Sequence, residues 1–160
     1  TQEARKGLWN FIRAHYSMID AVKGHIYTGE PLAFLLDESQ IQETIEPYFM
    51  ARIVDVAQFL RLYPFEGSIR PFHFVVTDPM AEWNNGIFSV ATDREGTVSV
   101  TDEPAGKAVE LDIQTLSAML MGYKRPSYLA RIERLHTDKR TLRLLEEIIP
   151  DGQPYFSDYF

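Results

Sequence analysis

The sequence predicts a fold of the α+β class, in which strands and helices occupy separate stretches of the chain. Between residues 72 and 101, three apolar or alternating segments are separated by residues that favour turns, which is typical of strands joined by hairpins. From residue 112 onward, apolar residues recur at helical spacing instead. Because such segregation characterises α+β folds, we expect an antiparallel or mixed sheet that is covered by helices.

Turns between the predicted strands follow from residues that tolerate a positive φ. Asn84-Asn85-Gly86 and Asp93-Arg94-Glu95-Gly96 each contain Asn or Gly, which adopt such angles at low steric cost. The strands around these breaks are predicted at residues 72–77, 86–91 and 97–101, and a further strand is predicted at 109–111. Three helices follow: one that Asp112 caps, one at 127–135 and one at 138–149.

The first part of the chain has a different pattern, and its change near residues 64–67 marks the best domain boundary. Asp55 suits the N-cap of a helix there, because its side chain can accept hydrogen bonds from free backbone N–H groups. The predicted elements are a helix at 2–15, a strand at 19–27, a short helix at 32–36, a strand at 44–53, and a helix from Asp55 to Tyr63-Pro64.

Composition excludes several classes of function. The formal net charge of -7 disfavours nucleic acid or an anionic membrane as the main partner, since both require a positive field, and it favours a cationic ligand. The basic residues gather between Lys124 and Arg143. The absence of cysteine excludes disulfides and thiolate metal sites, and no apolar run approaches the roughly 20 residues that span a bilayer. We expect a cytoplasmic protein.

Motifs for the common catalytic chemistries are also absent. No Gly-x-Gly pair opens a helix to cradle phosphate groups, and no Gly-x-Ser-x-Gly elbow presents a serine nucleophile. The histidines are dispersed without metal-ligand spacing, so we expect structural roles for His15, His25, His73 and His136. No cofactor or metal site is therefore predicted in this chain.

The C-terminal end of the chain is unusually aromatic, with Tyr155, Phe156, Tyr159 and Phe160 in the last six residues. Left in water, these side chains would expose much apolar area, so we expect this end to dock. A docked terminus brings its α-carboxylate, with an unperturbed pKa of about 3.3–3.7, which can accept a proton or bind an amine. The alternative is that the aromatic residues only pack against their own domain.

Short motifs in a defined order carry a resemblance that spans nearly the whole chain. They are Leu8-Trp9-Asn10-Phe11 with Asp20, Pro31-Leu32, Leu35-Leu36-Asp37, the run Met50–Val56, Leu111-Asp112 with Leu116, Gly122 and Tyr123, and the aromatic end. With these motifs the sequence resembles the C-terminal region of GNAT-superfamily N-acetyltransferases of the enhanced-intracellular-survival (Eis) type. In that family an N-terminal GNAT domain binds acetyl-CoA, a second GNAT-like region follows, and a sterol-carrier-like domain closes the chain.

The resemblance implies a division of this chain into two parts. Residues 1–62 would be the end of the second GNAT-like region, an α/β region, and residues 63–160 the sterol-carrier-protein-like domain. The acetyl-CoA site and the tyrosine general acid of the family lie upstream, and a helical pattern already runs at Thr1, so we expect the upstream GNAT domain to be missing. The fragment alone would be inactive, and acetyl-CoA would bind only in the full-length parent.

The resemblance also assigns roles to the last residues. The carboxylate of Phe160 would be the general base for the attacking amine of a cationic acceptor, such as an aminoglycoside or a lysine-like amine. A mycobacterial relative has an acidic penultimate residue that holds the aminoglycoside, whereas this chain has Tyr159 there and Asp158 one step earlier. Asp158 would then supply the negative charge beside Tyr159 in binding the substrate.

Two other functions remain open at this stage. The sterol-carrier fold in other proteins encloses an apolar tunnel, and six residues are candidates to line one, although core positions are the preferred interpretation: Phe74, Phe88, Leu116, Met119, Leu120 and Met121. The other function is that of an oligomerisation module, since members of the family assemble as oligomers, often hexamers. A homo-oligomer is therefore expected.

Overall fold

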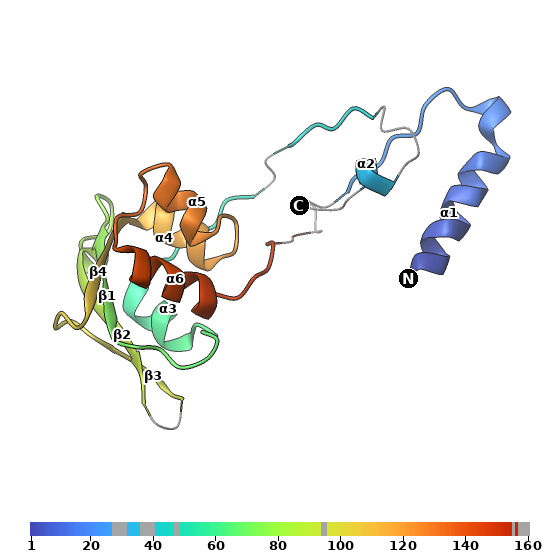
Figure 1. Ribbon diagram of the computed structural model, residues 1–160. Coiled ribbons are helices and arrows are strands. Elements are labelled where there is room, and N and C mark those ends of the chain that lie inside the picture. The colour runs from blue at the N-terminus through green and yellow to red at the C-terminus, as the bar shows by residue number, and fades with distance from the viewer. Residues whose placement is uncertain (27–31, 36–40, 47–48, 94–95, 155, 157–160) are drawn as a thin grey trace. The chain divides into compact units, whose positions relative to one another are not determined.

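A computed structural model describes residues 1–26, 32–35, 41–46, 49–93, 96–154 and 156 of the 160-residue chain. The chain forms two compact units, Thr1–Ile41 and Gln42–Phe160, which are treated separately below (Figure 1). Every helix in the described residues is too short or too polar to cross a bilayer.

The first unit contains α1 (Gln2–Ala14), a 3-10 turn η1 (Tyr16–Met18) and α2 (Leu32–Leu35). The Thr1 side chain caps α1 by accepting a hydrogen bond from the Ala4 N–H at 3.3 Å, and the helix predicted at residues 2–15 is confirmed. Leu8 and Phe11 on this helix are 62% and 66% exposed.

The strands predicted at 19–27 and 44–53 are wrong over their described residues. Residues 19–26, 44–46 and 49–53 are not in strands. Apolar character and β-branched residues favour an extended backbone, but a strand also needs a neighbouring strand to pair its N–H and C=O groups. Periodicity along one segment carries no information on whether such a neighbour is present.

The second unit is built on a four-stranded mixed sheet in the order β3-β2-β1-β4. Its strands are β1 (Phe72–Thr77), β2 (Gly86–Thr92), β3 (Val98–Thr101) and β4 (Lys107–Asp112). β1 pairs antiparallel with β2, where Phe74 is opposite Phe88, and parallel with β4, where Phe74 is opposite Val109. The chain thus forms a meander and then returns to the free edge of β1, which confirms the α+β class.

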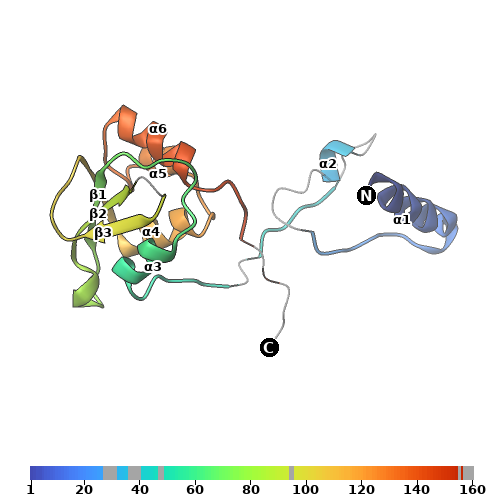
Figure 2. The ribbon, with the colours of Figure 1, turned by 90° about the horizontal axis from the view of Figure 1, so that it is seen from below.

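Four helices lie on one side of this sheet, as Figure 1 shows. They are α3 (Val56–Leu62), α4 (Ile113–Leu120), α5 (Pro126–Arg131) and α6 (Lys139–Ile148), and α5 and α6 pack against each other (Figure 2). Asp55 caps α3 by accepting from the Gln58 N–H at 2.9 Å, and Asp112 caps α4 by accepting from the Thr115 N–H at 2.7 Å. Both predicted caps are confirmed.

α5 ends earlier than the predicted helix at 127–135. Glu133 has a φ of 59°, in the left-handed region, which ends a right-handed helix. The chain then turns back, and His136 pairs with Glu110 through N–H to carbonyl bonds of 3.0 and 2.9 Å in the two directions. The segment after α5 therefore extends the edge of β4 for one bridge instead of continuing the helix.

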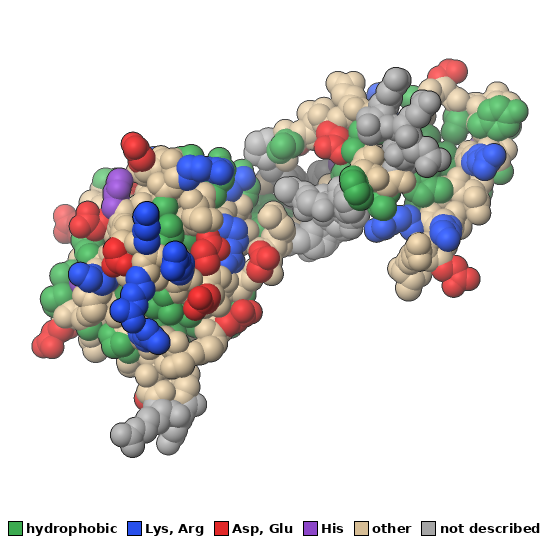
Figure 3. All heavy atoms as spheres, in the orientation of Figure 1, with side chains coloured by type: hydrophobic (Ala, Val, Ile, Leu, Met, Phe, Trp, Pro, Cys, Tyr) green, Lys and Arg blue, Asp and Glu red, His purple; other side chains and the backbone are tan. Residues whose placement is uncertain are grey.

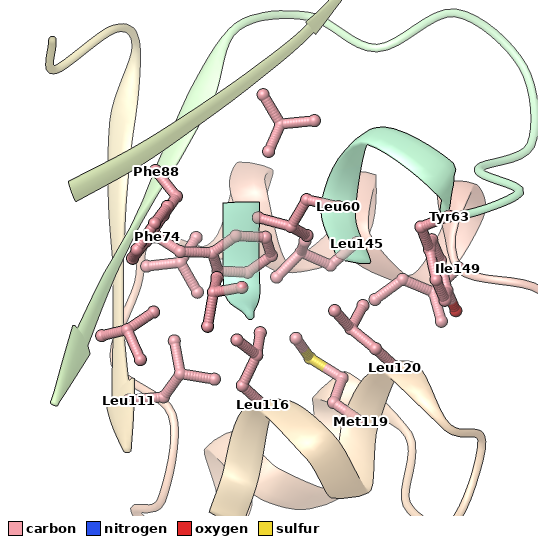
Figure 4. Packing of buried hydrophobic residues seen from close by; sticks show 14 of the residues in the cluster. Leu60, Tyr63, Phe74, Phe88, Leu111, Leu116, Met119, Leu120, Leu145 and Ile149 are labelled. Carbon is pink, nitrogen blue, oxygen red and sulfur yellow. The ribbon is translucent and has the colours of Figure 1, made fainter. Parts of the chain in front are cut away.

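One hydrophobic core fills the space between sheet and helices. Alternate residues of β1 point into it, and the helices contribute Leu60, Leu116 and Leu145, each completely buried (Figure 4). Val56 is also 0% exposed, so α3 belongs to this core. The domain boundary predicted after residue 62 stays a prediction. Of the six candidate tunnel residues, five are core members and Met121 packs against them.

A buried carboxylate ties the segment before α3 to the sheet. The Asp78 side chain has no solvent exposure and accepts two hydrogen bonds of 2.6 Å from the Arg52 guanidinium. The Asn84 amide donates to it at 2.9 Å, and the Met80 and Ala81 N–H groups donate at 3.0 and 3.2 Å. Burial alone would raise the pKa of Asp78, but these hydrogen bonds lower it to about 2.

Asn84 extends this connection to the backbone of the incoming segment. Its amide nitrogen donates to the Val54 carbonyl at 3.0 Å, and its amide oxygen accepts from the Val56 N–H at 3.1 Å. Ser117 of α4 accepts from the Ile53 N–H at 3.1 Å. Asn84 was interpreted as a turn residue, but it is 1% exposed and joins the β1–β2 connection to the start of α3.

We expect Leu116→Ala to lower the free energy of unfolding by about 2–5 kcal/mol, because it deletes a fully buried side chain and leaves a cavity in the core. Chemical denaturation measures this change. Leu62→Ala is the matched control, since Leu62 is 76% exposed, and it should shift the value by no more than about 0.5 kcal/mol. Equal losses in the two variants would contradict the packing described.

Asp78→Asn should destabilise the second unit in a pH-dependent way. The pKa of Asp78 falls from its ordinary value of 3.8 to about 2 on folding, so its ionised form stabilises the fold above about pH 4. That contribution is lost as the pH falls through about 2. Thermal unfolding between about pH 2 and 7 should therefore show a gap between wild type and variant that narrows on acidification. Asp102→Asn, at an exposed position, should show no such gap.

Candidate functional site at the root of the C-terminal segment

The residues predicted to carry the chemistry, Phe160, Asp158 and Tyr159, lie outside the described residues. The structure does describe the root of the segment that bears them, from the end of α6 at Ile148 to Pro154, and also Phe156. The position and direction of a chain end depend on how its root is held. The contacts of this root therefore define the candidate site.

Arg125 holds the root by binding the end of α6. Its guanidinium donates to the carbonyl oxygens of Glu146 at 2.7 Å, Ile149 at 2.9 Å and Pro150 at 3.1 Å. The last carbonyls of a helix have no partners within the helix and carry its negative dipole end, so a cation with several donors is well suited to bind them. The five N–H donors of arginine allow one side chain to bind three carbonyls together.

Glu146 orients the guanidinium from the side. Its carboxylate accepts from Arg125 Nε at 2.9 Å and lies 2.8 Å from a terminal nitrogen of the same group. The other carboxylate oxygen accepts from the Ser127 N–H at 2.6 Å, a donor in the first turn of α5 that has no helical partner. Burial acts to raise the pKa of Glu146, but the hydrogen bonds from Ser127 and Arg125 and the charge of Arg125 outweigh it and lower the pKa.

Tyr63 closes the same region from the core side. Figure 4 shows its ring beside Ile149, the residue whose carbonyl Arg125 binds. Burial raises the pKa of Tyr63 to about 12, while the positive charge of Arg125 acts in the opposite direction. The phenol therefore stays neutral, and its ring lies beside the residue whose carbonyl Arg125 binds.

Gly122 lets the terminal segment pass close to the domain at a second place. Its φ is 77°, and a Cβ at this position would lie 2.1 Å from the Gly152 carbonyl oxygen, closer than any side chain tolerates. The backbone of the terminal segment thus passes directly over the turn that follows α4. Further along, the Phe156 ring packs against Phe49 with 5.8 Å between ring centroids. Phe156 is still 40% exposed, so it is only partly docked.

On the face that Figure 3 shows, Lys and Arg side chains of the second unit lie beside Asp and Glu side chains. Arg134, for example, pairs with Asp112 at 2.6 Å. Burial acts to raise the pKa of Asp112, but hydrogen bonds from Thr115 and the charge of Arg134 lower it. Arg134 therefore resembles Arg125 in being ion-paired, but it binds no part of the terminal segment in the described residues.

The starts of the four helices of the second unit do not fit the phosphate groups of acetyl-CoA. Such groups bind free N–H groups at a helix start, and here protein side chains already accept from them. Carboxylates of Asp55, Asp112 and Asp138 accept at α3, α4 and α6, and Glu146 accepts at α5. These charges would also repel phosphate. Nor do the described residues contain a group of three or more potential metal ligands.

Two family models match consecutive parts of the chain. Residues 1–53 match the acetyltransferase (GNAT) domain, and residues 56–157 match the sterol carrier protein domain. The two matches meet at the segment that Arg52, Asp78 and Asn84 fix to the sheet. No curated protein matches the sequence.

Solved structures of acyltransferases are similar to the chain over almost all of its length. A probable N-acyltransferase of unknown function from Enterococcus faecalis is 32% identical, with a TM-score of 0.82, over 100% of this chain and 41% of that one. A GCN5-related N-acetyltransferase from Anabaena variabilis is 26% identical, with a TM-score of 0.78, over 96% and 39%. Eis1 from Mycobacterium abscessus, at 22% identity and a TM-score of 0.68 over 92% and 38%, shares the fold.

The chain spans about two fifths of the length of these structures. It is related to the GNAT acetyltransferases through its first third, and the larger match covers the whole sheet, its four helices and the root of the terminal segment. With residues 56–157 matched, which is more than half of its length, the chain belongs to the sterol carrier protein domain family.

Proposed function

We propose that this chain is the C-terminal part of an N-acetyltransferase of the enhanced-intracellular-survival type and that it supplies the general base of the reaction. Two observations support the proposal: the acetyltransferase match of residues 1–53, and the 32% identity to a probable N-acyltransferase over the whole chain. The observation that carries the assignment of the base is the binding of the root of the terminal segment by Arg125, together with the close passage of this root over Gly122.

In this proposal the α-carboxylate of Phe160 removes a proton from the acceptor. An aliphatic amine is protonated at neutral pH and has no lone pair for attack, whereas a terminal carboxylate is ionised above about pH 4. The base must reach within about 2.6–3.2 Å of the proton it removes, or act through one water. The freed amine attacks the carbonyl carbon of the acetyl thioester, and the C–N bond of the amide forms as the C–S bond breaks. The sulfur leaves as a thiolate and takes up a proton as the product nitrogen loses one, while the first proton passes from the carboxylate to solvent.

The acetyl group comes from acetyl-CoA, which in this proposal binds to the N-terminal GNAT domain of the full-length parent. The described helix starts, with their carboxylate caps, offer no place for its phosphates. Residues 1–160 alone would then be inactive, and turnover would require the upstream domain as an intramolecular partner. The role of this chain is restricted to the acceptor side.

Charge supports a cationic acceptor. The formal net charge of -7 attracts a polyamine-like substrate such as an aminoglycoside or a lysine-containing molecule. Asp158 and Tyr159 are proposed to bind it, the first by its negative charge and the second by its hydroxyl group and ring. A cytoplasmic location and assembly as a homo-oligomer belong to the same proposal.

A second candidate is the carriage of an apolar ligand, which the match to a sterol carrier protein domain favours. The six side chains considered for a tunnel belong to or pack against one continuous core, and five of them are less than 10% exposed. Met121 helps to line a shallow surface groove of about 330 Å³ beside α3, which is open to solvent. Because these side chains fill the core, we favour the acyltransferase function over the carrier function.

Deletion of Phe160 from the full-length enzyme should lower kcat by about 10²–10⁴-fold, the usual contribution of a general base, because it moves the carboxylate back by one residue, or about 3.5 Å. Phe160→Leu is the matched control, since it keeps the carboxylate in place and should retain most activity. Steady-state rates with acetyl-CoA and a polyamine acceptor measure both. Unchanged kcat after the deletion would rule out Phe160 as the base.

The carrier alternative makes a separate prediction. If the chain belongs to an acetyltransferase and its core is filled, organic extracts of the purified protein should contain no stoichiometric sterol or fatty acid by mass spectrometry. The control is a lipid-binding protein of similar size purified in the same way. A lipid recovered at about one molecule per chain in repeated preparations would support the carrier function instead.

A further inference from the structure

We propose that Arg125 is a positioning residue of the acetyl transfer: by binding the end of α6 and the two residues beyond it, Arg125 sets where the terminal carboxylate is delivered. This inference rests on the proposed function of Phe160. Arg125 does not touch the reacting atoms in this account and acts only through the segment that it holds.

The geometry separates Arg125 from an ordinary surface ion pair. A surface pair joins two side chains, whereas Arg125 binds the backbone carbonyls of three residues, Glu146, Ile149 and Pro150, at 2.7, 2.9 and 3.1 Å. Backbone contacts fix the path of the chain itself. Because they join the last turn of α6 and the first two residues outside it, they determine the direction in which the segment leaves the domain.

The charge of Arg125 is already balanced. The Glu146 carboxylate lies 2.8 Å from it, and Glu146 is itself held by the Ser127 N–H. Arg125 is therefore unsuited to bind or repel a charged substrate at long range, and its remaining donors are directed at carbonyl groups. Glu146 orients the guanidinium so that those donors reach the backbone of the terminal segment.

Each attachment shortens the tether between the domain and the carboxylate. Ten residues follow Pro150 and four follow Phe156. A shorter tether that still spans the distance to its target raises the effective concentration of its end, as it does for linked binding sites. Arg125, Gly122 and Phe49 would thus concentrate the base at its target.

The experiment uses the full-length enzyme with Arg125→Gln, Arg125→Lys, deletion of Phe160, and Arg125→Gln combined with that deletion. Arg134→Gln is the matched control, because Arg134 is also ion-paired at 2.6 Å but binds Asp112 and Thr115 rather than the terminal segment. The readouts are kcat, KM for acetyl-CoA, thermal stability, and the rate at which carboxypeptidase releases Phe160.

We expect Arg125→Gln to lower kcat by about 10- to 100-fold, the range that a displacement of about 1 Å produces, with KM for acetyl-CoA unchanged and faster release of Phe160. Arg134→Gln should change neither kcat nor release. Arg125→Lys should restore only part of kcat, because a compact ammonium cannot bind three carbonyls and a carboxylate together. If Arg125 acts through the carboxylate, the combined variant should be no slower than the deletion alone.

Three results would overturn the inference. Additive losses in the combined variant would mean that Arg125 acts independently of the carboxylate, through the fold. If deletion of Phe160 lowers kcat but Arg125→Gln does not, Arg125 has no positioning role and Phe160 remains the base. An unaffected deletion variant would remove the base itself and with it the role of Arg125, which separates failure of the proposed function from failure of this inference alone.

Discussion

A charged carboxylate that is fully removed from water must be given partners by the protein, and in the second unit this constraint organises the fold around Asp78. Its partners include Arg52, Asn84 and two backbone N–H groups of the turn after β1. Because Asn84 also binds the backbone on both sides of Asp55, the start of α3 is fixed to the β1–β2 connection. Val56 and Leu60 of α3 reach the core only from that position.

The end of α6 in the same unit is held in a similar way, with hydrogen-bond donors and acceptors exchanged. At the incoming segment a buried aspartate collects donors, whereas at α6 an arginine collects acceptors: three backbone carbonyls and one carboxylate. Both clusters join chain segments that are more than 20 residues apart in sequence, as the separations of 26 for Arg52 with Asp78 and 21 for Arg125 with Glu146 show. The core holds the helices on the sheet, and these polar clusters direct the two ends of the chain that leave it.

Much of the fold was predictable because its signals are local. The strand at residues 72–77 has the predicted limits, and the caps at Asp55 and Asp112 follow from one side chain and the next turn of helix. The strands predicted at 19–27 and 44–53 failed because strand pairing depends on a distant neighbour. Asn84 was predicted only as a turn residue, since nothing in Asn-Asn-Gly indicates that one amide will bind two segments.

The candidate site was less predictable than the fold. An aromatic chain end pointed to docking, and Phe160, Asp158 and Tyr159 remain predictions because they lie outside the described residues. Arg125 and Glu146 were missed, since no periodicity or motif sets Arg125 apart from the other basic residues between Lys124 and Arg143. The one available signal was the Pro126 that follows it, which starts α5 and leaves the Ser127 N–H for Glu146.

An enzyme that uses its own C-terminus as a base must solve a problem that an internal carboxylate avoids. Chain ends lose order readily, because only one side of the chain restrains them. In this chain the restraint begins before the end, at helix carbonyls that need partners in any case. Arg125 satisfies these groups and fixes the root of the terminal segment with the same hydrogen bonds, and Gly122 lets the backbone pass close enough to remain on the domain. Ordering the terminus thus requires few contacts beyond those that the end of α6 already demands.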